Sequence, residues 1–169
     1  MRKIILYIAS SLDGYVAREN GDIDWLPQSD TSEYDEFYKT IDAVIMGKTT
    51  YDQVLTFGEY PYKDKRSYVF TRNKNPTKDE NVEFVSNADE FVKDTLPNLE
   101  GNIWLVGGGQ IISTFVNNGI VDEIILSIVP VVLGKGIPLF RNIQKETKLE
   151  LIKTTDYDKL VELHYTILK

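Results

Sequence analysis

The chain has 169 residues, of which 42% are hydrophobic and 27% are charged, and this predicts one globular domain over residues 1–169 and excludes a disordered chain. The absence of cysteine and the single histidine exclude a disulfide scaffold, a thiol nucleophile and a metal site built from Cys or several His. The net charge of −7 disfavours general binding to nucleic acid or to an anionic membrane surface.

The first predicted element is a buried strand over Lys3–Ala9, which is rich in β-branched residues. The apolar run stops at the turn residues Ser10–Gly14, so it is too short to span a membrane. It also lacks the small-residue pattern of a signal-peptide cleavage site. We therefore expect a cytoplasmic protein.

Four further strands are predicted from short apolar runs, and the middle ones are apolar on both faces, as in a parallel sheet. These strands are Ala43–Met46, Ser67–Thr71, Asn102–Val106 and Glu123–Val129. Near the C-terminus, apolar and polar residues alternate on both sides of the turn Asp156–Asp158, which predicts an antiparallel hairpin.

Helices are predicted between the strands, where apolar residues recur every three or four positions. The first carries the stripe Tyr34–Ile41, and Asp30 with Glu33 forms a capping arrangement before it. The other stripes are Tyr51–Leu55, Phe91–Leu96 and Ile111–Val116. We expect the third helix to begin at Ser86 and end at Pro97. The alternation of strands and helices predicts an α/β domain with a mixed sheet.

Three glycines, Gly107–Gly109, join a predicted buried strand to a predicted helix. Glycine lets the backbone approach a ligand closely, and the unpaired N–H groups at a helix start attract phosphate. A tight strand-to-helix turn is the structural alternative, but such a turn rarely needs three consecutive glycines. We favour a phosphate site.

A second corner of this kind is Gly47–Thr50, where a strand ends in glycine and Lys48, Thr49 and Thr50 supply a cation and two hydroxyls. Its spacing does not match a Walker-type loop, and neither corner completes the usual Rossmann fingerprint. Two separate strand-to-helix anion sites indicate an extended ligand with phosphates in two places.

The stretch Lys63–Lys78 holds six basic residues and one acid, and it includes Arg72 at the end of a strand. A guanidinium can bind phosphate through two parallel hydrogen bonds. A solvated basic loop is at least equally consistent with this pattern alone.

Five motifs in this order resemble the dihydrofolate reductase superfamily, and within it the branch of the riboflavin-biosynthesis reductase domain. The motifs are Ile8–Gly14, Gly47–Tyr51, Thr71–Arg72, Val106–Gly109 and Val131–Phe140. The resemblance covers nearly the whole chain. It implies a three-layer α/β/α dihydrofolate-reductase-like fold, with a mixed, mainly parallel sheet and a C-terminal antiparallel hairpin.

The resemblance also implies that NADPH binds in an extended conformation at the carboxyl ends of the strands. It implies a cis peptide bond between Gly107 and Gly108. The implied contacts are Ala9, Gly14 and Val16 beside the nicotinamide; Gly47, Lys48, Thr49 and Thr50 on the pyrophosphate and adenosine side; Thr71 and Arg72 at the 2′-phosphate; and Val106, Gly107, Gly108, Gly109, Gln110 and Ile111 at the diphosphate.

The catalytic acid is left open. The resemblance implies an acid near the start of the first helix: aligned from Trp25 it falls on Asp30, and aligned back from Phe37 it falls on Glu33. Capping would explain either residue. Asp13 is a third candidate because the resemblance places its loop beside the nicotinamide, although it could only shape the turn. A bound water is an equal alternative as proton donor. We expect Trp25, which lies in a polar loop, to form a pocket wall.

The predicted function is therefore hydride transfer from NADPH to a small planar or carbonyl-bearing substrate. The resemblance also implies a homodimer. The arginine that would bind the glutamate carboxylate of folate is replaced by Lys65, which argues against folate. The net charge of −7 over Asp13–Asp42 argues against a phosphorylated substrate on that side. An authentic dihydrofolate reductase and a non-catalytic NADP(H)-binding module are the alternatives.

Overall fold

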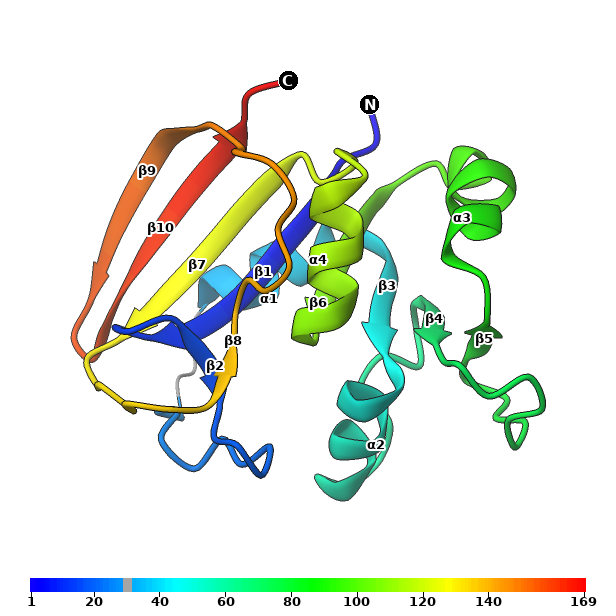
Figure 1. Ribbon diagram of the computed structural model, residues 1–169, viewed down its shortest axis with the longest axis horizontal. Coiled ribbons are helices and arrows are strands. Elements are labelled where there is room, and N and C mark those ends of the chain that lie inside the picture. Colours follow the sequence, from blue (N-terminus) through cyan, green and yellow to red (C-terminus); the bar gives the residue numbers. More distant parts are fainter. Residues whose placement is uncertain (29–31) are drawn as a thin grey trace.

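The computed structural model describes residues 1–28 and 32–169, and within them eight strands form one sheet, in the order β5-β4-β3-β6-β1-β7-β10-β9 (Figure 1). Strands β2 and β8 form a separate pair. The strands are β1 (Ile4–Ser11), β2 (Tyr15–Ala17), β3 (Ile41–Gly47), β4 (Arg66–Phe70), β5 (Glu83–Val85), β6 (Asn102–Gly107), β7 (Glu123–Val129), β8 (Ile137–Pro138), β9 (Leu149–Tyr157) and β10 (Leu160–Ile167). The helices are α1 (Ser32–Lys39), α2 (Lys48–Thr56), α3 (Ala88–Glu90) and α4 (Gly109–Asn117).

The sheet is parallel from β5 across to β7, so the carboxyl ends of these strands lie at one edge. Strand β10 pairs antiparallel with β7, and β9 pairs antiparallel with β10. The predicted C-terminal hairpin is therefore confirmed, and so is the predicted mixed, mainly parallel sheet.

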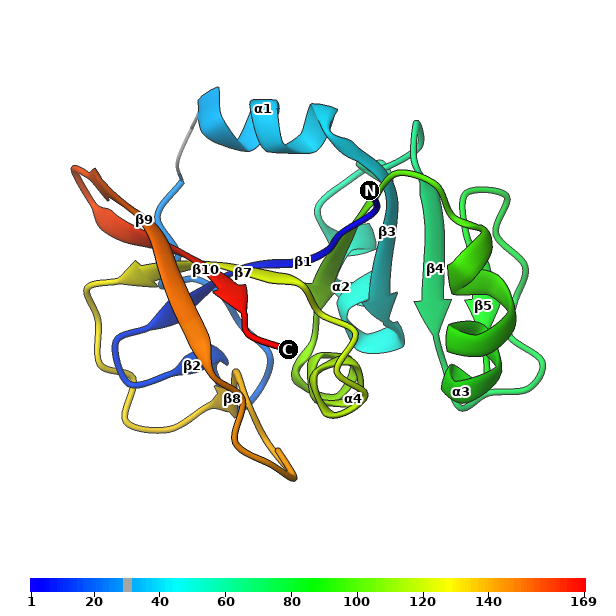
Figure 2. The same ribbon diagram turned by 90° about the horizontal axis from the view of Figure 1, so that it is seen from above.

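Helices cover both faces of the sheet, with α1 on one side and α4 on the other (Figure 2). On the α1 side, Tyr51 of α2 belongs to the same apolar cluster as Phe37 of α1 and Trp104 of β6. On the other side, Phe115 of α4 and Phe91, which follows α3, pack in a second cluster. The two clusters give the three layers that the resemblance implied.

The structure corrects the expected bounds of two helices. Ile41 begins β3 instead of ending α1, because Thr40 closes the helix by donating from its backbone N and its hydroxyl to the carbonyl of Phe37. Asn87, not Ser86, caps α3: its side chain accepts a hydrogen bond from the backbone N of Glu90 at 3.2 Å. The chain then continues through a π turn (Phe91–Thr95) and a 3-10 turn (Leu96–Asn98) that contains the proline at which the helix was expected to end.

Three short strands were not predicted, because two or three residues cannot show alternation: β2, β5 and β8. The β2–β8 pair matters for function, because it holds the loop before β9 against the loop after β1. The close approach requires glycine at Gly136, where φ is +159° and a Cβ atom would lie 2.3 Å from the carbonyl oxygen of Ala17.

Candidate functional site

The two glycine corners of the sequence meet in the structure. Strands β3 and β6 are parallel neighbours with Met46 in register with Gly107, so both strands end at the same place. A Cβ atom on Gly47 would lie 3.9 Å from the backbone N of Gly108 and 4.0 Å from the carbonyl oxygen of Gly107. No side chain separates the corners here, so an extended ligand can contact the backbone of both.

Each corner opens a helix of nine residues whose first turn is free to bind an anion. Gly47 is the N-cap of α2 and Gly108 is the N-cap of α4, and neither N-cap makes a side-chain hydrogen bond. The backbone N–H groups of a first helical turn and the helix dipole together favour phosphate. The peptide bond between Gly107 and Gly108 is cis, as the resemblance implied.

Helix α2 contributes a hydroxyl to the start of α4. A Cβ atom on Gly108 would lie 3.4 Å from Oγ1 of Thr50, so this side chain lies directly against the second corner. Lys48 lies on the outside of α2, where its ammonium group is 2.5 Å from Asp52 and 5.5 Å from the centre of the Tyr51 ring. Thr50 is therefore positioned between the corners, whereas Lys48 must leave Asp52 to reach a ligand.

The other residues near α4 that were predicted to contact the diphosphate differ in how deeply their side chains are buried. Gln110 is exposed beside the corner. The side chain of Ile111 belongs to the core on the α4 side, and that of Val106 packs against the core on the α1 side. The side chain of Ile111 is therefore not available to a ligand, whereas that of Val106 is only partly buried.

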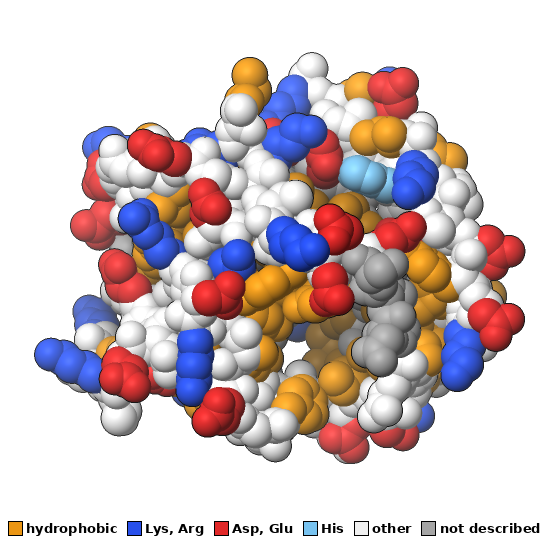
Figure 3. Space-filling model, turned by 180° about the vertical axis from the view of Figure 1, so that it is seen from behind, with side chains coloured by type: hydrophobic (Ala, Val, Ile, Leu, Met, Phe, Trp, Pro, Cys, Tyr) orange, Lys and Arg blue, Asp and Glu red, His pale blue; other side chains and the backbone are white. Residues whose placement is uncertain are grey.

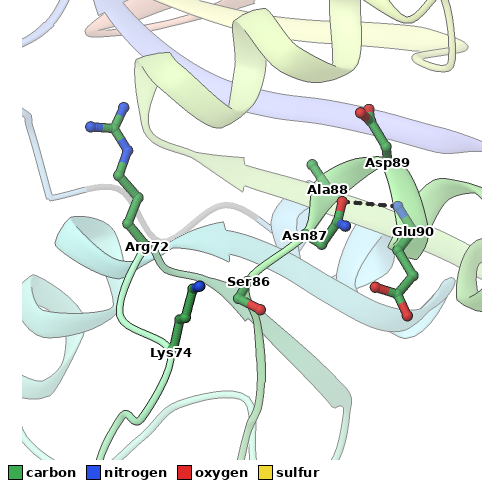
Figure 4. A pocket seen from close by; sticks show the side chains of 7 residues that line it. All are labelled: Arg72, Lys74, Ser86, Asn87, Ala88, Asp89 and Glu90. Atoms are coloured by element: carbon green, nitrogen blue, oxygen red, sulfur yellow. Dashed lines mark hydrogen bonds between the residues drawn. The ribbon is translucent and has the colours of Figure 1, made fainter.

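A pocket lined by two basic residues, Arg72 and Lys74, and two acidic residues, Asp89 and Glu90, lies beyond the end of β4. It has a volume of 410 Å³, and Figure 4 shows Arg72 and Lys74 on one side of it and residues 86–90 on the other. Arg72 and Lys74 are exposed and make no ion pair within residues 1–28 and 32–169. The two unpaired cations and the hydroxyl of Ser86 are suited to a phosphate group on their side of the pocket, whereas Asp89 and Glu90 disfavour an anion on the other side. The sequence identified Arg72 and Thr71, which precedes it, but assigned Ser86 only to a helix cap.

The end of β1 and the loop after it form a third side of the candidate site, in addition to the glycine corners and the pocket at Arg72. Ala9 is half-buried and is in register with Ser127 of β7. The loop turns at Gly14, where φ is +86°, and the carbonyl of Gly14 accepts a hydrogen bond from the backbone N of Leu139 at 2.9 Å. Val16, in β2, is partly buried against the core on the α4 side.

Asp13 has a structural role in this loop. Its carboxylate accepts hydrogen bonds from the Ser11 hydroxyl at 2.6 Å and from the backbone N of Leu133 and of Gly134 at 3.1 and 2.8 Å. The Ser11 hydroxyl first, and then these two amides, hold the pKa of the Asp13 carboxyl below its usual value. A general acid needs a pKa near the working pH, so this geometry favours the turn-shaping role over proton donation.

The other predicted catalytic residues are Asp30 and Glu33, which are close to α1 in the sequence. Asp30 falls outside the described residues. Glu33 is in the first turn of α1, and its carboxylate is 3.9 Å from the ammonium group of Lys153. Trp25 is half-buried, and its Nε1 is buried with no hydrogen-bond partner within the described part of the chain. An unpaired indole N–H is a donor that a ligand can use.

A polar group that was not predicted from the sequence lies on the face of the sheet that carries α1. Glu162 of β10 accepts hydrogen bonds from the Tyr7 hydroxyl at 3.1 Å and the Ser127 hydroxyl at 3.3 Å. Burial and the Glu162 carboxylate raise the pKa of the Tyr7 phenol, which therefore stays protonated. In the sequence, Glu162 is recognisable only as a polar position in an alternating strand, because its partners Tyr7 and Ser127 are far from it along the chain.

The face that carries α1 is hollowed. Figure 3 shows hydrophobic side chains on the floor of this hollow. An apolar hollow with a few polar groups suits a small flat ligand. Lys65, at the position expected to bind folate, instead lies 4.6 Å from the centre of the Tyr38 ring and 3.6 Å from Asp64.

Among the described residues there is no group of three or more His, Cys, Asp or Glu side chains that could hold a metal ion. None of the described helices is long and apolar enough to cross a membrane.

Comparison with known proteins finds relatives along nearly the whole chain. A family model described as the RibD C-terminal domain matches residues 2–163. "Uncharacterized protein YwjB" of Bacillus subtilis (strain 168) is 42% identical over 169 residues, which cover 97% of this chain and 97% of that protein. "Uncharacterized protein YyaP" of the same organism is 33% identical over 177 residues, covering 97% of this chain and 94% of that protein.

Solved structures share the fold. A "Putative riboflavin biosynthesis protein" from Shewanella sp. PV-4 is 26% identical with a TM-score of 0.87, over 99% of both chains. A Thermotoga maritima diaminohydroxyphosphoribosylaminopyrimidine deaminase/5-amino-6-(5-phosphoribosylamino)uracil reductase is 17% identical with a TM-score of 0.75, over 99% of this chain and 57% of that longer one. Enterococcus faecalis dihydrofolate reductase, complexed with NADP(H), is 18% identical with a TM-score of 0.73, over 99% of this chain and 97% of that chain.

Proposed function

This chain belongs to the RibD C-terminal domain family, and from that premise we propose that it is an NADPH-dependent reductase that transfers hydride to a small substrate with a carbonyl or imine group. The family and its dihydrofolate-reductase-like fold suggest a reductase. To the family and the fold, the proposal adds the identity of the cofactor and the class of substrate.

The observation that carries the proposal is the junction of the two glycine corners. Gly47 and Gly108 leave bare backbone where β3 and β6 end, and Thr50 adds a hydroxyl beside Gly108. The pocket that contains Arg72 and Lys74 lies further along the same edge of the sheet, after β4. Phosphate sites at both places fit an extended dinucleotide that carries a 2′-phosphate.

When bound, NADPH would supply a hydride from its nicotinamide ring. The residues of this chain would bind and orient the cofactor and the substrate and would exclude water from the reacting atoms. Ala9 and the loop through Gly14 would form the wall beside the nicotinamide. The apolar floor of the hollow on the α1 face would exclude water from the reacting atoms (Figure 3).

The proton would come from Glu33, Asp30 or a bound water. Glu33 is held in the first turn of α1, next to the hollow side of the sheet. Asp13 is the weakest of the predicted donors, because three hydrogen bonds stabilise its ionised form.

The test is equilibrium binding of NADPH and NADH to the purified protein, followed by NADPH oxidation with a panel of pterins, lactones and quinones. The proposal expects tight NADPH binding and turnover of one substrate class. Turnover of dihydrofolate above all others would identify an authentic dihydrofolate reductase. Binding without turnover across the panel would favour the non-catalytic module, and absence of dinucleotide binding would overturn the proposal.

Arg72→Ala should weaken NADPH binding about 10- to 100-fold and leave NADH binding nearly unchanged, because a charged hydrogen bond contributes about 1.5–3 kcal/mol and only NADPH carries the 2′-phosphate. Isothermal titration calorimetry would measure both dissociation constants. The matched control is Arg66→Ala, which removes an exposed arginine from the opposite end of β4. An equal loss for both dinucleotides would contradict the 2′-phosphate contact.

A further inference from the structure

Arg141 lies at the start of α4, although it is 32 residues away from this helix start along the chain. A Cβ atom on Gly109 would lie 2.9 Å from the carbonyl oxygen of Pro138, 3.2 Å from Nε and 3.5 Å from Nη2 of Arg141. The guanidinium group of the exposed Arg141 therefore lies beside the first residue of α4, next to the corner at Gly108. No motif in the sequence connects Arg141 to this corner.

The backbone around Arg141 is tied to α4. The hydroxyl of Ser113, a buried residue, donates a hydrogen bond to the carbonyl oxygen of Arg141 at 2.5 Å. One turn further along, Asn117 donates to the carbonyl oxygen of Asn142 and accepts from the backbone N of Gln144, each at 3.0 Å. Because this backbone runs along the helix, the fold itself places the guanidinium group at the first turn.

Arg141 is exposed, and the helix start beside it offers a cation no favourable partner. The N-terminus of a helix carries partial positive charge, so it repels a guanidinium group. The chain has 26 acidic residues against 19 basic ones, yet Arg141 makes no ion pair in the described part of the chain. Arg18, by contrast, is paired with Asp24 at 2.6 Å. An anion bound between the guanidinium group and the helix start would remove this repulsion.

We propose that Arg141 binds the bridging diphosphate of the dinucleotide, together with Thr50 and the first turn of α4. The inference rests on the proposed function and adds a phosphate-binding residue to it. Thr50 lies against Gly108 and Arg141 against Gly109, so a hydroxyl and a guanidinium group contact consecutive residues of the same helix start. The guanidinium group can bind two phosphate oxygens through parallel hydrogen bonds.

The proposed diphosphate contact predicts that substitutions of Arg141 and of Arg72 affect the binding of NADPH and NADH differently. The bridging diphosphate is present in both NADPH and NADH, whereas the 2′-phosphate is present only in NADPH. Arg141→Ala should therefore weaken NADPH and NADH binding by the same factor, about 10- to 100-fold. Binding of adenosine 2′-monophosphate, which has no diphosphate, should not change. Arg141→Lys should restore part of the affinity, because an ammonium group is a point charge without the planar fork.

The experiment is isothermal titration calorimetry of the whole protein with these three ligands. Lys145→Ala is the matched control, since it removes one positive charge from an exposed position on the same segment. The urea midpoint of Arg141→Ala should match that of the wild type, because the carbonyl bonded to Ser113 is retained. Unchanged NADPH affinity, or a loss confined to NADPH, would overturn the diphosphate contact. A wild-type protein that binds neither dinucleotide would overturn the proposed function itself, and this contact with it.

Discussion

Gly47→Val should abolish tight NADPH binding while leaving the protein folded. The backbone at Gly47 has φ −79° and ψ 161°, which any L-residue can adopt, so the substitution adds no strain. Its Cβ would lie 3.9 Å from the backbone N of Gly108, and the two methyl groups would fill the junction of the corners. We expect the dissociation constant to rise about 100-fold or more, which corresponds to at least ~2.7 kcal/mol.

A graded series makes this test specific. Gly47→Ala adds only the Cβ, so it should weaken NADPH binding less than Gly47→Val does. Fluorescence titration would measure NADPH binding, and urea denaturation would show that both variants unfold near the wild-type midpoint. A folded Gly47→Val protein that binds NADPH as the wild type does would show that the coenzyme does not use this junction.

Trp104→Ala should give the largest loss of stability. Trp104 is 6% exposed, its ring packs against Tyr7, Phe37 and Tyr62, and its Nε1 donates to the carbonyl oxygen of Tyr7 at 3.0 Å. Removing the ring leaves a cavity between the sheet and α1. We expect the free energy of unfolding to fall by about 3–5 kcal/mol.

Urea denaturation followed by far-UV circular dichroism would measure the change. Phe57→Ala is the matched control, because Phe57 is 67% exposed and its removal should change the free energy of unfolding by less than about 0.5 kcal/mol. If Trp104→Ala lost no more stability than the control, the aromatic cluster would not hold α1 on the sheet.

The homodimer expected from the resemblance stays a prediction, which analytical ultracentrifugation of the same samples would check.

Features that depend on neighbouring residues were predictable from the sequence. The strand-to-helix corners at Gly47 and Gly107–Gly109 follow from an apolar run, glycine and an amphipathic stripe, and both are present. The hairpin of β9 and β10 follows from alternation with a period of two. The third helix was less predictable, because its turns change from α to π to 3-10 within eleven residues, Ala88–Asn98.

The sequence by itself determined the order of the longer strands and the helices and the positions of the bare-backbone corners, because helix and strand periods depend on residues a few positions apart. Only the tertiary structure decided which distant groups share the site. It brought Thr50 to Gly108, Arg141 to Gly109, and Glu162 to Tyr7 and Ser127. These contacts depend on strand order and on where long loops cross the helices, and both result from packing the whole chain.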